Sequence, residues 1–227
     1  MLTLLPERLD SVVLIGAHCD DIVVGCGGTL LELCRAYPGV SVTALTFTGG
    51  GSLLEQEERA ALAAFCPGAR LRVAVLDFPN GDLMTRWDRI KRALEDLRGR
   101  ADPSLMFAPP GRDSHPDRRV LAELMPIVFP DHLILGYEIA QRDGELDQPR
   151  MFSPLAEPVI REKIEKILEN YGSQRDRPSF DAESLAGLAR VRGLQSGARY
   201  AEAFHVSRMV LGLAPLGGGG LHGPPVS

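Results

Sequence analysis

A histidine and two aspartates occur together in one short segment of this 227-residue sequence, His18-Cys19-Asp20-Asp21, directly after an apolar run. Imidazole and carboxylate groups are good ligands for zinc and similar divalent ions, and a catalytic site needs three protein ligands with an open position for water. His18 and Asp21 could supply two of these ligands. Asp20 would then point elsewhere and could act as a general base that takes a proton from the bound water.

A second polar segment, from Asp113 to Asp117, follows a later apolar run. Its histidine, His115, could polarise a substrate oxygen or protonate a leaving group, and Asp117 could hold the imidazole ring in one tautomer. The two segments together contain the residue types that a metal-assisted hydrolytic site requires.

The same residues also have a structural explanation, which stays open at this point. Asp20 or Asp21 could cap the helix that follows, and Ser114 with Pro116 is typical of an N-cap residue followed by a proline in the first helical turn. Aspartates and histidines are common near helix starts for such reasons. The residue types alone do not choose between capping and metal binding.

Apolar runs and helical patterns alternate along the first 140 residues. Runs typical of buried parallel strands lie at residues 11–17, 40–47, 71–78, 105–108 and 132–139, and helical patterns lie at 29–36, 55–65 and 86–97. Strands that are separated by such helices predict right-handed crossovers. We therefore expect an α/β fold, a Rossmann-like three-layer sandwich with a mostly parallel central sheet.

The rest of the sequence is less regular. After a polar loop at 141–150, helices are expected from about 158 to 171 and from about 182 to 192, with a late strand at 203–211. The final Gly- and Pro-rich stretch has too little to bury to offset the entropy of ordering it. We expect residues 1–211 to form a single domain and residues 212–227 to form a flexible tail.

The predicted sheet brings the polar segments to one place. Ligands of an open parallel sheet bind beyond the carboxyl ends of its strands, and both polar segments follow strands. Thr46 and Thr48 lie at the end of the second strand, and His205 in the late strand could approach the same edge. The segment Gly25-Cys26-Gly27-Gly28 is not a dinucleotide fingerprint, and close helix packing is the favoured explanation for it.

Composition argues against several kinds of partner. The net charge of -5 and the pI near 5.6 give no basic field for a phosphate backbone, so no nucleic acid partner is expected. The start lacks the segments of a signal peptide, and no window approaches about 18 apolar residues, so we expect no membrane partner and a cytoplasmic location. The four cysteines show no CxxC spacing, which favours reduced thiols.

Motifs along the sequence carry a resemblance to a known family. AHCDDIVVGCGGTL at 17–30 is similar to an opening motif whose usual form is AHPDDE followed by a GCGGT-like turn. LTFTGGG, FPNGDL and SHPDRRV are similar to its second-strand end, third loop and HPDH motif, and YGSQ and RGLQSGARYAEAF to its C-terminal signature. In this order, over residues 11 to about 211, they resemble the PIG-L or LmbE-like family of N-acetylglucosaminyl deacetylases.

The resemblance implies a Rossmann-like sheet with a zinc site at the strand ends, and hydrolysis of the N-acetyl group of amino sugars and related amides. It implies that His18 and Asp21 are metal ligands and that Asp20 is the general base. It further implies that His115 supports the oxyanion or the leaving amine, with Asp117 orienting its ring. The implied partner is a small amino-sugar conjugate, and a homo-oligomer is suggested.

Departures from the family pattern surround the same pocket. The third zinc ligand of the family is the second histidine of HPDH, and here Arg118 stands in its place. A guanidinium is always charged and has no lone pair to give to a metal. Asp113 or a shifted His115 could complete a weaker site, or Arg118 could replace the ion as a fixed positive charge. Further changes are Cys19 and Ile22 for the usual Pro and Glu, and Glu55 for an arginine of many relatives.

We therefore predict a metal-dependent hydrolase that removes an acyl group, N-acetyl by resemblance, from an amino-sugar conjugate. Its divalent ion, zinc by resemblance, would occupy a site altered by Arg118. The alternative is a non-catalytic or metal-free relative that binds a sugar or nucleotide-sugar ligand, with Arg118 pairing to a carboxylate or phosphate. Thr48 and Arg118 are the candidate substrate-binding residues. A nucleotide-binding enzyme is disfavoured because no acidic ribose ligand follows a glycine fingerprint.

Overall fold

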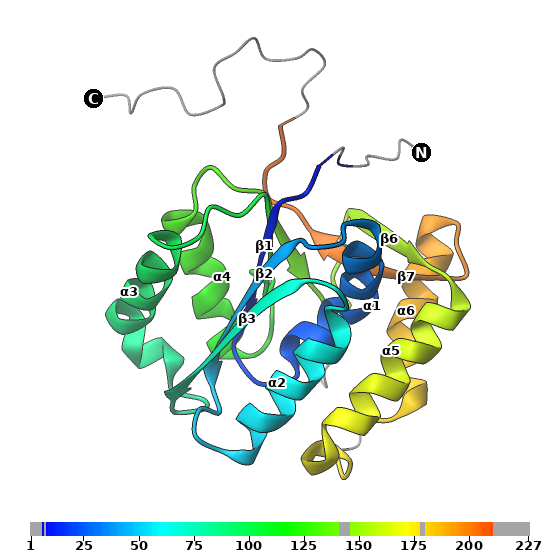
Figure 1. Ribbon diagram of the computed structural model, residues 1–227, viewed down its shortest axis with the longest axis horizontal. Coiled ribbons are helices and arrows are strands. Elements are labelled where there is room, and N and C mark those ends of the chain that lie inside the picture. Colours follow the sequence, from blue (N-terminus) through cyan, green and yellow to red (C-terminus); the bar gives the residue numbers. More distant parts are fainter. Residues whose placement is uncertain (1–5, 7, 141–145, 178–179, 211–227) are drawn as a thin grey trace.

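A seven-stranded sheet lies between two layers of helices in the computed structural model, which describes residues 6, 8–140, 146–177 and 180–210 (Figure 1). The strands are β1 Ser11–Gly16, β2 Ser41–Thr48, β3 Arg70–Phe78, β4 Leu105–Ala108, β5 Ile134–Tyr137, β6 Met151–Leu155 and β7 Tyr200–His205. The helices are α1 Asp21–Ala36, α2 Leu53–Phe65, α3 Trp87–Arg98, α4 Pro116–Val128, α5 Glu157–Asn170 and α6 Ala182–Ser196, with short 3-10 helices η1 Leu83–Arg86 and η2 Gly172–Gln174. The expected α/β three-layer architecture is confirmed.

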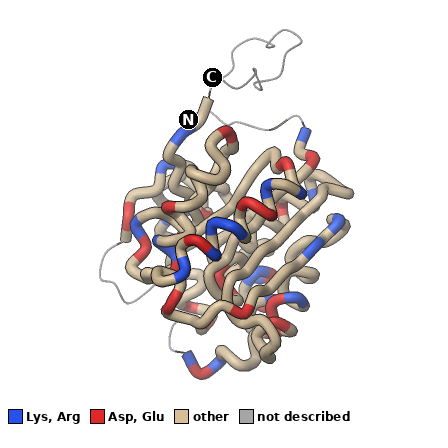
Figure 2. Tube along the Cα trace, turned by 90° about the vertical axis from the view of Figure 1, so that its left-hand side faces the viewer, with Lys and Arg blue, Asp and Glu red and all other residues tan. Residues whose placement is uncertain are grey.

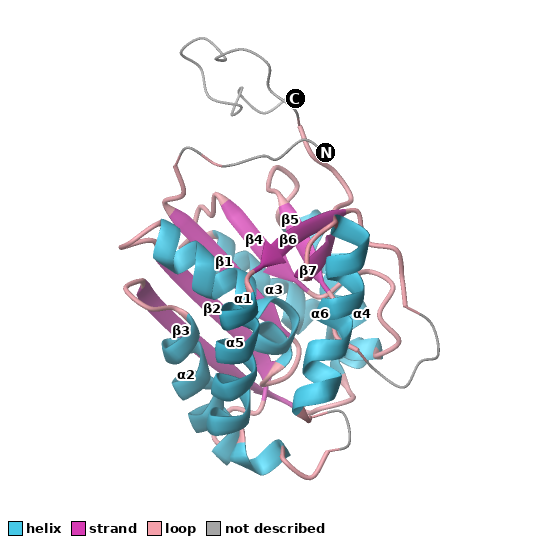
Figure 3. Ribbon diagram, turned by 90° about the vertical axis from the view of Figure 1, so that its right-hand side faces the viewer, coloured by secondary structure: helices cyan, strands magenta, loops and turns pink. Residues whose placement is uncertain are grey.

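The two faces of the sheet carry different helices, as Figure 3 shows on both sides of the strands. Leu30 of α1, Leu62 of α2 and Ile167 of α5 belong to one hydrophobic core. Ile90 of α3 and Leu121 of α4 belong to a second core on the opposite face. The sheet is therefore covered on both sides, which is why its central strands are apolar throughout.

The central strand β1 contributes to both cores. Val12 and Leu14 belong to the first core, and Val13 and Ile15 to the second. Successive side chains of a strand point to opposite faces, so an uninterrupted apolar run is what a doubly covered strand requires. All four side chains are almost completely buried. This run is the sequence feature that places β1 at the centre.

The strand order, β3-β2-β1-β4-β5-β7-β6, places a topological switch point beside β1. From β1 the chain passes to β2 and β3 on one side, and it returns to β4 on the other side of β1, with β2 and β4 both parallel to β1. The loops after β1 and β4 diverge at such a switch point and leave room for a ligand. His18 follows β1 and His115 follows β4, so the topology brings the two polar segments together.

Several boundaries differ from those expected. β7 ends at His205 rather than extending to 211, and it runs antiparallel to both β5 and β6. β6 was not expected; it contains Pro154, whose missing N–H is tolerated because β6 lies at the edge of the sheet. α1 begins at Asp21 rather than at 29 and is kinked at Cys26. The expected tail at 212–227 and residues 141–145 of the polar loop lie outside the described residues.

The glycine-rich start of α1 allows close packing, as expected. A Cβ atom on Gly25 would lie 2.2 Å from Cδ2 of Tyr137, and one on Gly27 would lie 2.7 Å from Cε1 of Phe65. Any side chain here would push α1 away from the sheet and from α2. These glycines therefore serve packing next to the site.

The surface carries basic and acidic residues in alternation, and Figure 2 shows blue and red segments interspersed along the chain. In the part of the chain that the structure describes, no helix combines the length and the apolar character needed to cross a bilayer.

Candidate active site

The turn between β1 and α1 is fixed by Asp21, the first residue of α1. Its Oδ2 accepts backbone N–H bonds from Ala17 at 3.1 Å and from His18 at 3.0 Å. Asp20 occupies the N-cap position, but its side chain makes no capping hydrogen bond. N-capping of α1 therefore explains neither aspartate. Asp21 accepts the backbone N–H groups that follow β1, and the Asp20 carboxylate makes no capping hydrogen bond.

Arg118 of α4 forms a buried ion pair with Asp21. Its Nη2 lies 2.5 Å from Oδ1 of Asp21, and its Nε lies 3.1 Å from Oδ1 and 3.2 Å from Oδ2. Burial alone would raise the pKa of Asp21, but the adjacent guanidinium and His18 hold this pKa well below its usual range. Both oxygens of Asp21 are thus already occupied by cationic or N–H donors.

Asp113 links the guanidinium to the start of α4. Its Oδ2 lies 3.5 Å from Nη1 of Arg118, and its Oδ1 accepts the backbone N–H of His115 at 2.7 Å. The N-cap residue of α4 is His115 and not the expected Ser114, because the imidazole rather than the serine hydroxyl accepts the N–H of Asp117. Asp113 therefore holds Arg118 and does not face outward as a spare ligand.

His18 lies between two carboxylates. Its Nε2 is 3.2 Å from Oδ2 of Asp117, and its Nδ1 is 3.5 Å from Oδ2 of Asp21. Burial by itself lowers the pKa of His18, but hydrogen bonding and charge from Asp21, with a contribution from Asp117, outweigh it, so the pKa is raised. The two carboxylates therefore favour the protonated form of the His18 ring.

Asp117 connects the third loop of the sheet to this cluster. Its fully buried carboxylate accepts backbone N–H bonds from Gly81 at 2.7 Å and from Leu83 at 3.0 Å, besides its contact with His18. It does not contact the His115 side chain; only the backbone N–H of Asp117 reaches Nδ1 of His115, at 3.2 Å. The orienting group for His115 is therefore a peptide N–H, and the Asp117 carboxylate orients His18.

The rings of His18 and His115 meet edge to face, with centroids 4.5 Å apart. Burial and the nearby charges of His18 and Arg118 lower the pKa of His115, which keeps its ring neutral. Since Nδ1 accepts a hydrogen bond, the proton of the neutral ring is assigned to Nε2. His115 thus carries a potential donor beside the imidazole of His18.

His18, His115 and Asp117 each offer a ligand atom, and these atoms lie within 4.8 Å of one another. Two imidazoles and one carboxylate are a donor set that suits a divalent ion such as zinc. The pair that the sequence indicated, His18 with Asp21, lies directly against the positive charge of Arg118. The cluster of His18, His115 and Asp117 is displaced from that pair, and its carboxylate is bonded to backbone N–H groups of Gly81 and Leu83 rather than to a guanidinium.

Asp20 lies beside this cluster in a buried setting. Desolvation, followed by repulsion from Asp21, raises the pKa of Asp20 to about 8, although Arg177 opposes the shift. Nη1 of Arg177 is 3.1 Å from Oδ2 of Asp20. A carboxyl group with such a pKa exchanges a proton near neutral pH, which is the property of a general acid or base.

The two residues expected to bind substrate are both engaged within the protein. The buried Thr48 hydroxyl donates to the carbonyl of Ala17 at 3.0 Å. Arg118 has only 7% of its side chain exposed and is directed at Asp21 and Asp113. A direct contact of either side chain with substrate would require these bonds to be exchanged.

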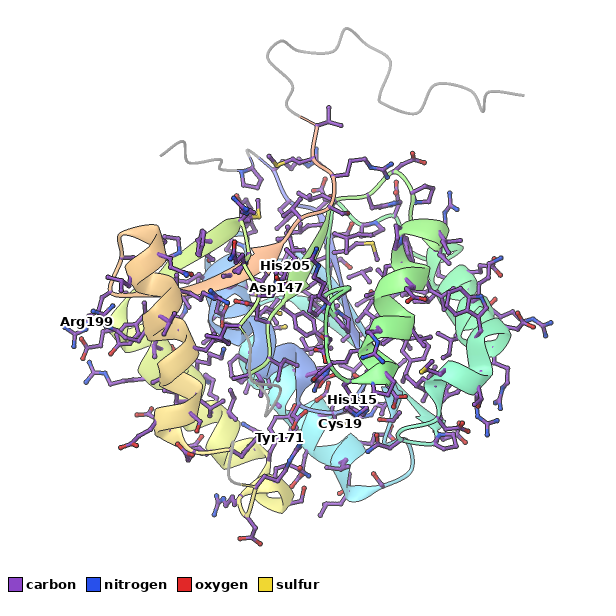
Figure 4. The ribbon with its side chains drawn as sticks, turned by 180° about the vertical axis from the view of Figure 1, so that it is seen from behind. Cys19, His115, Asp147, Tyr171, Arg199 and His205 are labelled. Carbon is purple, nitrogen blue, oxygen red and sulfur yellow. The ribbon has the colours of Figure 1, made fainter. Side chains whose placement is uncertain are left out.

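His205 lies away from the cluster, and Figure 4 shows it with Asp147 at a distance from His115 and Cys19. Its Nε2 is 3.9 Å from the nearest oxygens of Glu138 and Asp147. A groove of about 1000 Å³ lies beside His205, and the described residues that line it do not include His18, His115 or Asp117. Its lining includes Ser114, next to His115, and His205. The groove is large enough for a sugar conjugate.

Three residues of this region were missed in the sequence. Glu58 of α2 is fully buried and receives the backbone N–H of Asp20 at 2.9 Å. Tyr171 and Arg177 come from the segment after α5 and contact Glu58 and Asp20 respectively. Glu58 could have been noticed because it lies at helical spacing from the apolar Ala61 and Leu62, which places a charged side chain on the buried face of α2. Tyr171 could have been noticed as the first residue of the YGSQ motif. No sequence pattern indicated Arg177.

The family model described as GlcNAc-PI de-N-acetylase matches residues 13–129, which is about half of the chain. The chain therefore belongs to the PIG-L family. This membership, expected from the motifs, is confirmed and places the chain among the N-deacetylases, which are hydrolases.

Solved structures share the fold over most of their length. An N,N'-diacetylchitobiose deacetylase from Pyrococcus horikoshii is 19% identical, with a TM-score of 0.67 over 88% of this chain and 84% of that chain. A teicoplanin deacetylase in a zinc-inhibited form is 16% identical, with a TM-score of 0.65 over 88% and 99%. A 4-carboxy-2-hydroxymuconate hydratase from Pseudomonas putida KT2440 is 17% identical, with a TM-score of 0.68 over 91% and 100%. At these identities the similarity is one of fold.

Proposed function

We propose that this protein hydrolyses the N-acyl group, acetyl in the first instance, of a small amino-sugar conjugate. The observation that carries the proposal is the His18, His115 and Asp117 cluster at the switch point of a PIG-L fold. Asp20, with its raised pKa, lies in the same turn as His18. The groove lined by Ser114 and His205 is the candidate place for the rest of the conjugate.

A divalent ion, with zinc as the candidate, would be held by His18, His115 and Asp117. Such an ion lowers the pKa of a bound water and polarises an acyl oxygen. His18 would have to give up the proton that it shares with Asp117, and Asp21 would remain paired with Arg118. The expected role of Asp21 as a ligand thereby passes to Asp117.

Asp20 is the proton-transfer residue in this proposal. Deprotonated Asp20 takes a proton from the attacking water, and the resulting carboxylic acid can return it to the departing amine. Arg177 lies at the exposed side of Asp20 and opposes the effect of burial on its pKa. Arg118 compensates the charge of Asp21 and thereby reduces the repulsion that a deprotonated Asp20 experiences.

His115 can serve as a metal ligand or as a donor to a substrate oxygen, but not both through Nε2. A ligand atom needs a free lone pair, whereas a donor needs the proton that the present hydrogen bonds assign to Nε2. The donor role, through the proton on Nε2, is therefore available only in a metal-free arrangement.

The buried Arg118–Asp21 ion pair favours such an arrangement as a second candidate function. A fixed guanidinium would take the place of the ion, and the protein would bind a sugar or nucleotide-sugar ligand without hydrolysing it. Nε2 of His115 would then donate to an oxygen of the ligand.

Metal titration of two matched variants tests the proposal. Metal-free protein is supplemented with zinc, bound metal is measured by mass spectrometry, and acetate release is followed with N-acetylglucosamine conjugates. A displaced site predicts that His115→Ala loses zinc while Asp21→Asn keeps it. Wild-type protein that binds no metal and releases no acetate would support the binding function instead.

A further inference from the structure

Glu58 is a buried carboxylate for which the proposed reaction has no direct use. It lies on the buried side of α2 with no exposed surface, and its Oε1 accepts the hydroxyl of Thr46 at 3.0 Å. Its Oε2 accepts the backbone N–H of Asp20 at 2.9 Å and the hydroxyl of Tyr171. One side chain of α2 thus joins β2, the β1–α1 turn and the segment after α5.

The backbone that Glu58 holds is strained. Asp20 has φ 93° and ψ -29°, and among the described residues it is the non-glycine residue with positive φ. This left-handed conformation is disfavoured for a residue with a Cβ atom, although aspartate tolerates it better than most, and it persists where the surroundings favour it. The bond from the Asp20 N–H to the buried Glu58 carboxylate holds one side of this residue, and the bond from the Val24 N–H to the Asp20 carbonyl at 3.0 Å holds the other.

Glu58 also acts on Asp20 from its other side. The Tyr171 hydroxyl donates to Glu58. The backbone carbonyl of Tyr171 accepts the N–H of Gln174 at 3.1 Å, and the backbone carbonyl of Gln174 accepts the N–H of Arg177 at 3.0 Å. The guanidinium of Arg177 is then placed against Asp20, with a second contact to the Gln174 side chain at 2.9 Å. The YGSQ motif is explained by this turn, because it connects Glu58 to Arg177.

We propose that Glu58 is the positioning residue for Asp20. It fixes the backbone of Asp20 directly and delivers Arg177 to the Asp20 carboxylate through Tyr171, without touching the substrate itself. This inference rests on the proposed function for its catalytic consequence, but the physical coupling between Glu58 and Asp20 can be measured without turnover.

The kinetic test compares Glu58→Ala with Glu58→Gln, which keeps one acceptor oxygen. Misplacement of a proton-transfer group by about 1 Å costs on the order of 100-fold in rate, so Glu58→Ala should lower kcat by about that factor with KM within about 3-fold. Glu58→Gln should recover part of the loss. Glu57→Gln is the matched control, because Glu57 holds the same turn through Ser173 but does not contact Asp20.

Unchanged kcat in folded Glu58→Ala, or an equal loss in Glu57→Gln, would overturn the proposal. If Glu58→Ala does not fold, the comparison of Glu58→Gln with Glu57→Gln decides by the same criterion. If the wild-type protein releases no acetate, the proposed function fails and the coupling is decided by stability alone.

The stability test is a double-mutant cycle in which Glu58 is changed in the wild-type protein, in Asp20→Gly and in Asp20→Asn. In Asp20→Asn the change of Glu58 also lets the strained backbone relax, which offsets part of the lost hydrogen bond, whereas glycine adopts positive φ without strain and has none to release. The loss of Tm caused by changing Glu58 should therefore be larger in Asp20→Gly than in Asp20→Asn, by about 3 °C. Asp20→Asn keeps the Cβ atom but removes the charge, and thereby separates backbone strain from repulsion between the carboxylates. Equal losses in these two backgrounds would show that Glu58 does not hold the Asp20 backbone. Glu58→Gln replaces Glu58→Ala throughout if the latter does not fold.

Discussion

The guanidinium of Arg118 lies against both carboxylate oxygens of Asp21, in a pair with 7% and 0% of the two side chains exposed. The family motif has a histidine where Arg118 stands, and the structure shows that the arginine turns inward and neutralises the aspartate. The positive charge of Arg118 thus compensates the negative charge of Asp21.

Replacing Arg118 with histidine should create a metal site at Asp21. Arg118→His removes the competing charge and supplies a lone pair beside His18 and Asp21, so zinc binding should become tighter by at least about 10-fold, with a rise in Tm on adding zinc. Isothermal titration and thermal unfolding measure both effects.

Arg118→Met serves as the control, since it removes the charge without adding a ligand. It should leave Asp21 buried without its partner and lower stability by about 3 to 5 kcal/mol, and it should bind zinc less tightly than Arg118→His because it adds no ligand. A zinc affinity of Arg118→His equal to that of the wild type would contradict the assignment.

Asp20→Asn should abolish acetate release. General bases contribute about 100- to 10,000-fold in rate, and an amide cannot accept the proton from water. The fold should remain, because among the described residues the Asp20 side chain bonds to the half-exposed Arg177 alone. Activity of purified variants, with the exposed Asp96→Asn as a control, is the measurement. An Asp20→Asn variant with more than about a tenth of the wild-type rate would remove Asp20 from the mechanism.

The pH dependence of kcat/KM should follow Asp20. Desolvation and the charge of Asp21 raise its pKa to about 8, so the base form increases as the pH rises through that value and activity should rise with it. Arg177 favours the charged form, so Arg177→Met should raise the pKa further and move the rising limb to higher pH. A limb that does not move in Arg177→Met would separate the profile from Asp20.

Gly25→Ala should be destabilising although alanine is the better helix former. The new Cβ would lie 2.2 Å from the ring of Tyr137, whose hydroxyl is held by the carbonyl of Ile15 at 2.8 Å. Such overpacking costs about 1 to 3 kcal/mol, to be measured by urea unfolding. Gly187→Ala in α6 is the control, because a Cβ there meets nothing within 4 Å and should be neutral or stabilising. Equal stabilities of the two variants would refute the packing role.

Local patterns in the sequence were sufficient for the elements around β1. The run from Val12 to Ile15 predicted a central strand because both faces of such a strand must be apolar, and the alternation with helices predicted the parallel sheet. The order of the motifs indicated the family. These features depend on neighbours along the chain, so they can be read without knowing which distant residues meet. β6 was not predicted, because its position at the edge of the sheet, which makes Pro154 acceptable, cannot be recognised from neighbouring residues in the sequence.

Tertiary structure decided which charges pair. Arg118 and Asp21 are 97 residues apart, and His18 and Asp117 are 99 apart, so residue types alone could equally place Asp21 on a metal and Asp117 on His115. The choice depends on the direction of each side chain in a buried space, where every carboxylate must find a donor. The sequence by itself located the site at the ends of β1 and β4. The three-dimensional packing determined that Asp21 is neutralised by Arg118 and that Asp117 stands beside the two histidines.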